Sequence, residues 1–277
     1  MDQQSGQESG QPSGHLMLIT PERVFYAGLL GRPRERCPGA FHIYVAIEGS
    51  LFLSAAGGRE SHEELLVVPP NVRHTISSDH RSVICLVIEP ETVRAGALEA
   101  LLERLSGPQR PSFARRIREA YAQLRQRQRR DDISSVEFDH MCFGEALPQR
   151  ALDPRVARSI RQIGRFSGEP VTAASCAAEA ELSASRFLHL FKQETGISFR
   201  AFRAWKRARH LLHFANQDLN LAHLAQDIGY PDSTHFSHSI RRFYGLKPRA
   251  IFSGSRDLAI YRSNRPAADS ALTQEAG

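Results

Sequence analysis

The stretch LAHLAQDIGYPDSTHFSHSIRRFYGLKP, residues 221–248, decides the fold of the C-terminal third of this chain. Its first half repeats apolar residues at the i, i+3, i+4, i+7 spacing of one α-helical stripe: Leu221, Leu224, Ala225 and Ile228. After a turn at Gly229, a second helical stripe follows: Phe236, Ile240 and Phe243. Helix, tight turn and helix form the helix-turn-helix unit, whose second helix enters the major groove of DNA.

An earlier copy of the same pattern begins at Ala173. Its first helical stripe consists of small residues: Ala173, Cys176, Ala177 and Ala180. After a turn containing Ser183, the stripe of the second helix is Phe187, Leu190 and Phe191. Gly196 matches Gly245 as a helix-ending glycine. A plain helical bundle with a duplicated hairpin would share this pattern, but short polar outward positions followed by basic residues favour DNA binding.

The segment between the copies, Ser198 to His213, is predicted to be one helix with Phe199, Phe202, Trp205 and Leu212 on its apolar stripe. Sixteen helical residues span about 24 Å, which makes a rigid spacer. Two recognition helices on one face of DNA read major-groove segments about 34 Å apart. A monomer is therefore expected to read two adjacent half-elements that need not be palindromic.

Charge is distributed unevenly along the chain. The whole sequence carries a net charge of +6, while residues 154–254 alone hold 15 Lys and Arg against 7 Asp and Glu, a net of +8. The remainder is therefore slightly acidic, at −2. A basic C-terminal domain beside a near-neutral remainder is typical of a polyanion-binding module, although a solvated basic face gives the same signal.

Residues 181–212 (ELSASRFLHLFKQETGISFRAFRAWKRARHLL) and 220–248 resemble the DNA-binding domain of AraC/XylS-type transcriptional regulators. The second copy matches the family pattern of Gly-aromatic, Asp, Ser/Thr, Phe, then Phe, Gly and Pro. The resemblance extends from Asp153 to about Phe252 and implies seven helices, with two helix-turn-helix units joined by a long helix. It predicts a sequence-specific transcription factor that binds double-stranded DNA, with RNA polymerase as a candidate partner.

The sequence departs from the family pattern at four positions. Glu181 stands where the first turn commonly has Gly, and Phe199 where many members have Pro after the first recognition helix. His189 and His238 stand where the family usually has Arg. Neutral His makes one contact where Arg makes a bidentate contact to guanine worth about 1–3 kcal/mol. We therefore expect a weaker guanine preference, and tighter DNA binding as the pH falls through about 6.5.

Helical phase assigns roles within each second helix, because residues off the apolar stripe can face DNA. The expected base-contacting residues are Ser185, Arg186, Leu188, His189, Ser233, His235, Ser237 and His238. Leu188 is expected to meet a thymine methyl group. Thr234 is expected to cap its helix and hold a phosphate. The other phosphate candidates are Lys192, Arg241 and Arg242.

Residues 16–90 read as a β domain. Short β-rich runs at 41–55, 65–70, 72–77 and 82–90 are separated by Glu48-Gly49, Gly57-Gly58 and Pro69-Pro70-Asn71. Such runs predict a small barrel or sandwich. Their order resembles the cupin-type sensor barrels that precede this DNA-binding domain in many family members. The expected fold class is therefore α+β multidomain: an N-terminal cupin-like barrel with helices, and a C-terminal all-α domain.

The predicted barrel presents His42, Tyr44 and His74 as its candidate ligand-binding residues, although packed core residues are an equal alternative. The cupin resemblance implies three His and a carboxylate for a metal site, and Tyr44 replaces one of those His. Two imidazoles alone rarely hold a catalytic metal. We therefore expect no metal, no cofactor and no catalytic residue, and an unknown small-molecule effector. The alternative function is a cupin-type enzyme carrying an appended DNA-binding domain.

The remaining segments complete the predicted organisation. Residues 91–152 carry helical apolar stripes and are expected to form a linker that pairs subunits into a homodimer, as such helices do in relatives. Residues 1–15 and 255–277 are polar and read as a disordered leader and tail around the sensor (16–90) and DNA-binding (153–254) parts. Widely spaced cysteines and no apolar run of membrane-spanning length predict a protein of the bacterial cytoplasm, associated with the nucleoid.

Overall fold

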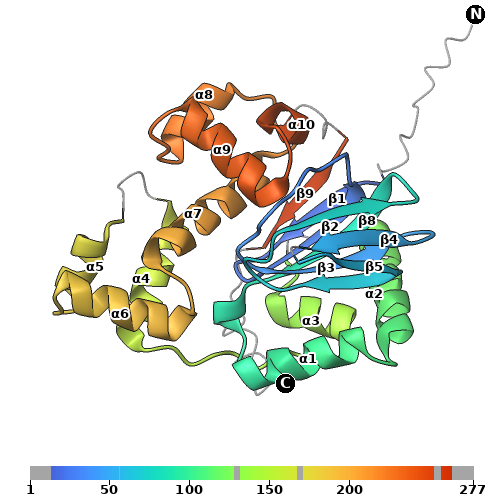
Figure 1. The fold of residues 1–277 in the computed structure, drawn as a ribbon, viewed down its shortest axis with the longest axis horizontal. Helices are drawn as coiled ribbons and strands as arrows, with labels where there is room; N and C mark the ends of the chain where they lie inside the picture. The colour runs from blue at the N-terminus through green and yellow to red at the C-terminus, as the bar shows by residue number, and fades with distance from the viewer. Residues whose placement is uncertain (1–13, 56, 128–131, 167–170, 253–256, 264–277) are drawn as a thin grey trace, which may run out of the picture.

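The computed structural model describes residues 14–55, 57–127, 132–166, 171–252 and 257–263 (Figure 1). The first half contains two β-sheets. The larger has the order β6-β3-β8-β2-β1-β9, with bounds β6 Leu65–Val68, β3 Phe41–Ala46, β8 Ser82–Ile88, β2 Arg23–Leu29, β1 Leu16–Ile19 and β9 Ala259–Arg262. The smaller has the order β5-β4-β7, with bounds β5 Arg59–Glu63, β4 Leu51–Ala55 and β7 His74–Ser78.

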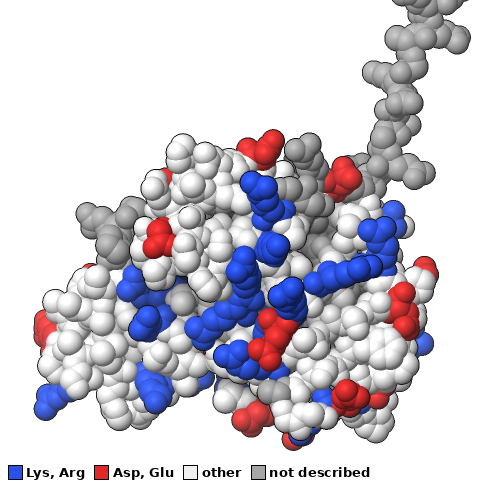
Figure 2. Space-filling view, turned by 45° about the horizontal axis from the view of Figure 1, so that its top comes forward, with Lys and Arg blue, Asp and Glu red and all other residues white. Residues whose placement is uncertain are grey.

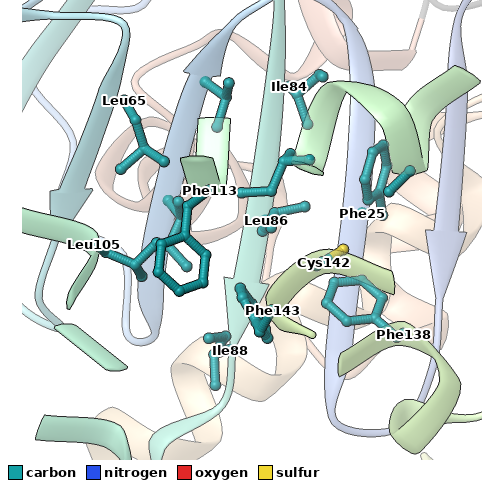
Figure 3. Close-up of a cluster of buried hydrophobic side chains, with 14 of the residues drawn as sticks. Phe25, Leu65, Ile84, Leu86, Ile88, Leu105, Phe113, Phe138, Cys142 and Phe143 are labelled. Carbon is teal, nitrogen blue, oxygen red and sulfur yellow. The ribbon is translucent and has the colours of Figure 1, made fainter. Parts of the chain in front are cut away.

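One face of the large sheet is covered by three helices, α1 (Ala95–Ser106), α2 (Arg110–Gln126) and α3 (Ser135–Phe143). Alternation along the strands supplies the apolar residues of this face, such as Ile43 and Val45 on β3, both fully buried. Figure 3 shows helix residues, among them Leu105, Phe113 and Phe138, packed against the sheet. Each such fully buried large apolar side chain contributes about 1.5–3 kcal/mol. The segment 91–152 is thus helical, as predicted.

The opposite face of the large sheet is covered by two different layers. The small sheet covers one part, where Tyr44, Leu66 and Val83 pack with residues of β4 and β7. The other part, which includes Met17 and Val87, packs against helix α7 (Phe199–His210) of the C-terminal half. The predicted closed barrel is therefore wrong for the described residues. They form two sheets, and helix α7 of the C-terminal half fills the space that further strands would occupy in a barrel.

The C-terminal tail was also predicted incorrectly over residues 259–262. Strand β9 pairs in parallel with β1, from Leu16–Ala259 to Ile19–Arg262. Ile260 packs on the face of the large sheet that contacts α7, and Tyr261 packs on the opposite face, which α1, α2 and α3 cover. A four-residue strand within a polar tail has no detectable periodicity, and its partner strand is distant in sequence. The remaining predicted leader and tail residues, 1–13 and 264–277, lie outside the described residues.

The helical half consists of seven α-helices within residues 154–166 and 171–252, as the family pattern implies. They are α4 Pro154–Arg165, α5 Ala173–Glu179, α6 Ala184–Thr195, α7, α8 Leu221–Asp227, α9 Ser233–Tyr244 and α10 Pro248–Phe252. One apolar core holds α4–α6 with Phe199 and Phe202 of α7. A second core holds α8–α10 with Leu211, in the 3-10 turn Leu211–Phe214 that follows α7. Figure 1 shows α7 lying between the two helix groups.

Both helix-turn-helix turns use the same backbone conformation with different residues. Gly229 has φ of 80°, and the matching Glu181 has φ of 54°. Both values lie in the left-handed region, which costs a residue with a side chain roughly 1–2 kcal/mol. The first turn is therefore made without glycine, as predicted, and Glu181 carries the strain.

A buried ion network joins the two halves of the molecule. The carboxylate of Glu89, fully buried after β8, accepts hydrogen bonds from Trp205 Nε1 at 3.1 and 3.0 Å. Lys206 Nζ lies 2.7 Å and Arg209 Nε 2.8 Å from the same carboxylate. Burial alone would raise the pKa of Glu89, but the charges of Lys206 and Arg209 bring its pKa below the ordinary value. Glu89 is therefore ionised at neutral pH and neutralises cations of α7.

We predict that Glu181→Gly stabilises the protein. Glycine removes the strain of the left-handed conformation in the first turn. Glycine also raises the conformational entropy of the unfolded chain, but the relieved strain exceeds this entropic cost by up to about 1 kcal/mol. Thermal unfolding of the two proteins measures the difference. Gly229→Ala is the matched control and should lower stability by a similar amount, since it introduces the same strain in the second turn. A Glu181→Gly protein that unfolds at a lower temperature than the parent would contradict this account.

We predict that Glu89→Gln destabilises the protein strongly. Gln can still accept a hydrogen bond from Trp205, but it leaves Arg209 enclosed without a counter-charge and Lys206 with Glu91 alone, at a cost of about 3 kcal/mol. Urea unfolding measures the loss. Glu63→Gln is the control, because Glu63 pairs with Arg110 at the exposed rim, and such pairs contribute less than about 1 kcal/mol. Equal effects of the two substitutions would show that the Glu89 network does not join the halves.

Candidate nucleic-acid interface and sensor cluster

The two recognition helices, α6 and α9, bury an aromatic stripe and expose the residues beside it. Phe187 and Phe191 of α6 are fully enclosed, as are Phe236 and Ile240 of α9. Seven of the eight predicted base-contacting residues are exposed, and Ser237 is half-buried; the exposed ones are Ser185, Arg186, Leu188, His189, Ser233, His235 and His238. The helical phase was therefore predicted correctly. The contacts of these residues with bases stay a prediction.

Helix α6 is capped by Ser183, whose side chain accepts a hydrogen bond from the backbone N–H of Arg186. This cap satisfies one of the free N–H groups of the first turn and fixes where the outward face starts. Leu188 leaves 41% of its surface exposed on this face, which is unusual for a leucine beside a well-packed core. An exposed leucine is suited to apolar contact with a thymine methyl group.

Helix α9 is capped by Asp232, and the prediction that Thr234 caps it was wrong. Asp232 Oδ1 accepts hydrogen bonds from the backbone N–H groups of Thr234 and His235, both at 2.8 Å. The residue that precedes a helix can reach these groups with its side chain, whereas Thr234 already lies in the first turn. The bonds from His235 are the main cause that lowers the pKa of Asp232. Thr234 is exposed and free to meet a phosphate.

His235 has a partner that the sequence pattern did not indicate. Its Nδ1 lies 2.8 Å from Asp232 Oδ2, so the imidazole is held beside the start of the helix. An Asp three residues before His, at a helix start, is the signal that could have revealed this pair. The contact fixes the orientation of His235 and leaves Nε2 as the ring nitrogen that faces outward.

The basic side chains divide between two roles. Lys192, Arg241 and Arg242 are exposed, as expected of phosphate contacts. Figure 2 shows Lys and Arg gathered in a band across one face of the molecule, with acidic side chains in its middle. Lys206 and Arg209, which belong to the same basic sequence, instead lie in the ion network with Glu89. The basic composition of the domain thus serves both the exposed face and the junction between the halves.

The three predicted ligand-binding residues do lie together. His42 and Tyr44 are on β3, on the face of the large sheet opposite α1, α2 and α3, and His74 is on β7. The Tyr44 hydroxyl is 3.2 Å from His74 Nε2, and the rings of His42 and Tyr44 are 5.8 Å apart. His74 Nδ1 donates to the Val72 carbonyl, which leaves Nε2 to accept from Tyr44. Burial lowers the pKa of His42 to about 3 and that of His74 to about 4, so both rings are neutral at physiological pH.

Sequence reasoning missed Arg36, the charged member of this cluster. Its guanidinium carbon lies 5.0 Å from the centre of the Tyr44 ring. The Arg36 side chain is buried, and its Nε and Nη2 atoms have no hydrogen-bond partner. Nothing in the segment GRPRERC separates Arg36 from its neighbours Arg32 and Arg34, both of which are exposed. Cys85 of β8 lies opposite Tyr44 in the pairing of β3 with β8. We call Arg36, His42, Tyr44, His74 and Cys85 the sensor cluster.

A separate cavity of about 300 Å³ lies near the free edges of the two sheets, beside α1 and the start of α2. Its lining is mainly aliphatic, and its charged residues include Glu63 and Arg110, which pair at 2.5 Å. Within the described part of the chain, no group of three His, Cys, Asp or Glu side chains is placed to hold a metal ion. The described helices include none that is long and apolar enough to cross a membrane.

Comparisons with known proteins agree with this geometry. A family profile described as a helix-turn-helix domain matches residues 176–253. The HTH-type transcriptional activator RhaS of Escherichia fergusonii is 29% identical over 157 residues, which cover 52% of this chain and 55% of RhaS. The chain thus spans about half the length of this curated relative.

Solved structures of ToxT from Vibrio cholerae share the fold over most of the chain. Ligand-free ToxT of strain SCE256 superposes with a TM-score of 0.55 at 12% identity, covering 84% of this chain and 97% of ToxT. ToxT of strain O395 gives a TM-score of 0.52 at 9% identity, covering 84% and 99%. The matched profile shows that this chain carries a helix-turn-helix domain in residues 176–253, and the ToxT structures show that its fold is shared over most of the chain.

Proposed function

We propose that this protein is a sequence-specific DNA-binding transcription regulator, and that a small molecule bound by its β-rich half controls it. The observation that carries the proposal is the pair of recognition helices, each with polar outward residues over a buried aromatic stripe. Such helices present side chains to base edges in the major groove. The family of the C-terminal domain and the activator RhaS support the same function.

The DNA contacts that we propose follow the exposed faces of α6 and α9. Base contacts come from Ser185, Arg186, Leu188, His189, Ser233, His235, Ser237 and His238. Phosphate contacts come from Thr234, Lys192, Arg241 and Arg242. Regulation of transcription in the bacterial cytoplasm, a homodimer formed through the helices of residues 91–152, and contact with RNA polymerase complete the proposal.

A small-molecule effector fits the sensor half better than a catalytic reaction does. One ToxT structure contains a bound unsaturated fatty acid, so a protein of this fold does bind a small molecule. In this chain His42, Tyr44 and His74 lie between the small sheet and α7, where a ligand would contact both halves. A cupin-type enzyme remains the alternative. Stoichiometric iron, zinc or manganese in the purified protein would favour it.

The arrangement of the halves gives such an effector a route to DNA. The C-terminal end of α9 is bonded to the loop before β3, and α7 is bonded to Glu89. The placement of the second helix-turn-helix unit therefore depends on the sheet domain. A ligand that moves this contact changes the spacing of the two recognition helices, and hence the affinity for a site of two half-elements.

We predict sequence-specific binding that depends on Arg241. Selection from random duplexes at about 150 mM salt should yield a site of two half-elements, and Arg241→Ala should weaken binding to all sequences alike while reducing the salt slope by about 1. Leu188→Ser should instead relax preference at one position of the site, because a thymine methyl contact is lost. The matched control is Arg73→Ala, an exposed arginine of the sheet domain. If the protein binds the selected site no more tightly than random duplex DNA, the proposed function is contradicted.

We predict that DNA affinity rises several-fold as the pH falls from 8 to 6 at constant salt. An imidazole that gains a proton at lower pH becomes a cation, and a cation contacts the DNA phosphates more strongly than a neutral ring does. The exposed rings are His189, His235 and His238, of which His235 is paired with Asp232. A double variant, His189→Gln with His238→Gln, should lose most of this dependence. Equal affinity of the parent protein at both pH values would contradict the role of the two histidines.

A further inference from the structure

Arg36 is a buried cation that pairs with no carboxylate of the described residues. Its relative exposure is 9%, and both Nε and Nη2 lack a hydrogen-bond partner. The neighbouring carboxylate, Glu35, is exposed and pairs with Arg73 at 2.8 Å. The contact of the guanidinium group with the face of Tyr44, at 5.0 Å, offsets a part of the desolvation cost. Enclosed charges in proteins are ordinarily paired, so the free edge of this group requires an explanation.

A second arginine of the same domain shows what this edge binds. Arg23, also buried, uses its Nε and Nη2 to donate to the two oxygens of Asp139, at 2.8 and 3.0 Å. These two N–H groups point the same way and match the spacing of carboxylate oxygens. In Arg36 the same two atoms are the unpartnered ones. The Nε and Nη2 edge of Arg36 therefore has the donor geometry of a carboxylate site.

The surroundings of Arg36 favour a ligand with one negative charge. Burial lowers the pKa of His42 and of His74, so neither ring adds a positive charge. Burial also raises the pKa of Tyr44 and brings that of Cys85 to about 12, so neither is ionised. The cluster thus holds a single net positive charge. A monocarboxylate neutralises it, whereas a phosphate dianion would leave an enclosed negative charge.

We infer that Arg36 is the residue that binds the carboxylate group of a small-molecule effector, within the sensor cluster and beside α7. The inference rests on the proposed function, since it names the chemical class of the effector. The neutral side chain of Tyr44 lies over the Arg36 guanidinium group, and His74 pairs with Arg36 through the backbone, so both residues would border the ligand. Trp205 borders the site as well, with its ring 6.0 Å from that of His42.

The loop that carries Arg36 also holds the second recognition helix. The N–H of Arg34 donates to the Gly245 carbonyl at 2.8 Å, and the N–H of Cys37 donates to the Arg242 carbonyl at 2.7 Å. Gly245 has φ of 69°, and a Cβ there would collide with the Arg34 carbonyl oxygen, so the two segments are in close contact. Arg36 itself pairs with His74 of β7 through its backbone. Binding at Arg36 therefore acts on the end of α9 through one or two residues.

The experiment uses the purified full-length chain and three probe acids: acetate, hexanoate and benzoate. Each has its primary amide as an uncharged control, and inorganic phosphate is the competing anion. Binding is followed by the fluorescence of Trp205, the single tryptophan of the chain, and by thermal unfolding. Affinity for the selected DNA site is measured with and without each probe. The variant is Arg36→Gln, and the matched control is Arg73→Gln, an exposed arginine near the same loop.

We expect at least one acid to bind with a Kd of about 1 mM or tighter, at least tenfold more tightly than its amide, and to change DNA affinity. Arg36→Gln should lose both effects, and Arg73→Gln should keep them. Without ligand, Arg36→Gln should unfold at no lower temperature than the parent, because it removes an enclosed, unpaired charge. This last result excludes a merely structural role for Arg36.

Several outcomes would overturn the inference: no acid binds, an amide binds as well as its acid, phosphate alone binds, or Arg36→Gln retains binding. A large loss of stability in ligand-free Arg36→Gln would also overturn it. DNA binding by the ligand-free parent protein separates this inference from the proposed function. Sequence-specific DNA binding without any response to acids would support the proposed function and contradict the carboxylate site. Acid binding without sequence-specific DNA binding would support the carboxylate site and contradict the proposed function.

Discussion

The arrangement of the whole molecule depends on the buried carboxylate of Glu89. It lies at the end of β8 and accepts bonds from Trp205 while neutralising Lys206 and Arg209, all within one helix of the DNA-binding half. Removing this charge from water is costly, and only its three partners offset that cost. Because the partners occupy one face of α7, the helix can dock on the sheet in one orientation. The orientation of α7 in turn sets where both helix-turn-helix units lie.

The two units relate differently to the sheet domain. The second unit lies against it directly, through the bonds from Arg34 and Cys37 to the end of α9. Strand β9, which follows this unit, joins the edge of the large sheet beside β1 and brings the chain back to its first strand (Figure 1). The first unit has a separate apolar core, which it shares with Phe199 and Phe202 at the start of α7. A change in the sheet domain is therefore transmitted most directly to the second recognition helix.

Two buried arginines show how the same side chain serves stability or binding according to its partner. Arg23 is paired with Asp139 and fixes α3 to β2. Arg36 is enclosed to a similar degree but pairs with no carboxylate of the described residues. Its neighbours are neutral, because burial keeps the proton on Tyr44 and keeps the His74 ring from gaining one. A domain that keeps such a charge gives up stability in the ligand-free state. The carboxylate ligand that we infer would restore this stability by pairing with Arg36, close to the contact between the two halves.

The sequence by itself determined the two helix-turn-helix units. Their apolar residues recur at helical spacing, their turns and end glycines lie at matched positions, and every one of these signals is local in the chain. It also determined which faces of α6 and α9 are exposed, and that His42, Tyr44 and His74 lie together. Only the tertiary structure decided the pairing of β9 with β1, the filling of the open sheet by α7, the capping by Asp232, and the isolation of Arg36. Each of these depends on atoms brought together across a long separation in sequence, or on a side chain's choice between competing partners. Arg36 illustrates the reason: the sequence shows three arginines within five residues, and only the packing of Tyr44 and His74 around one of them leaves it buried and unpaired.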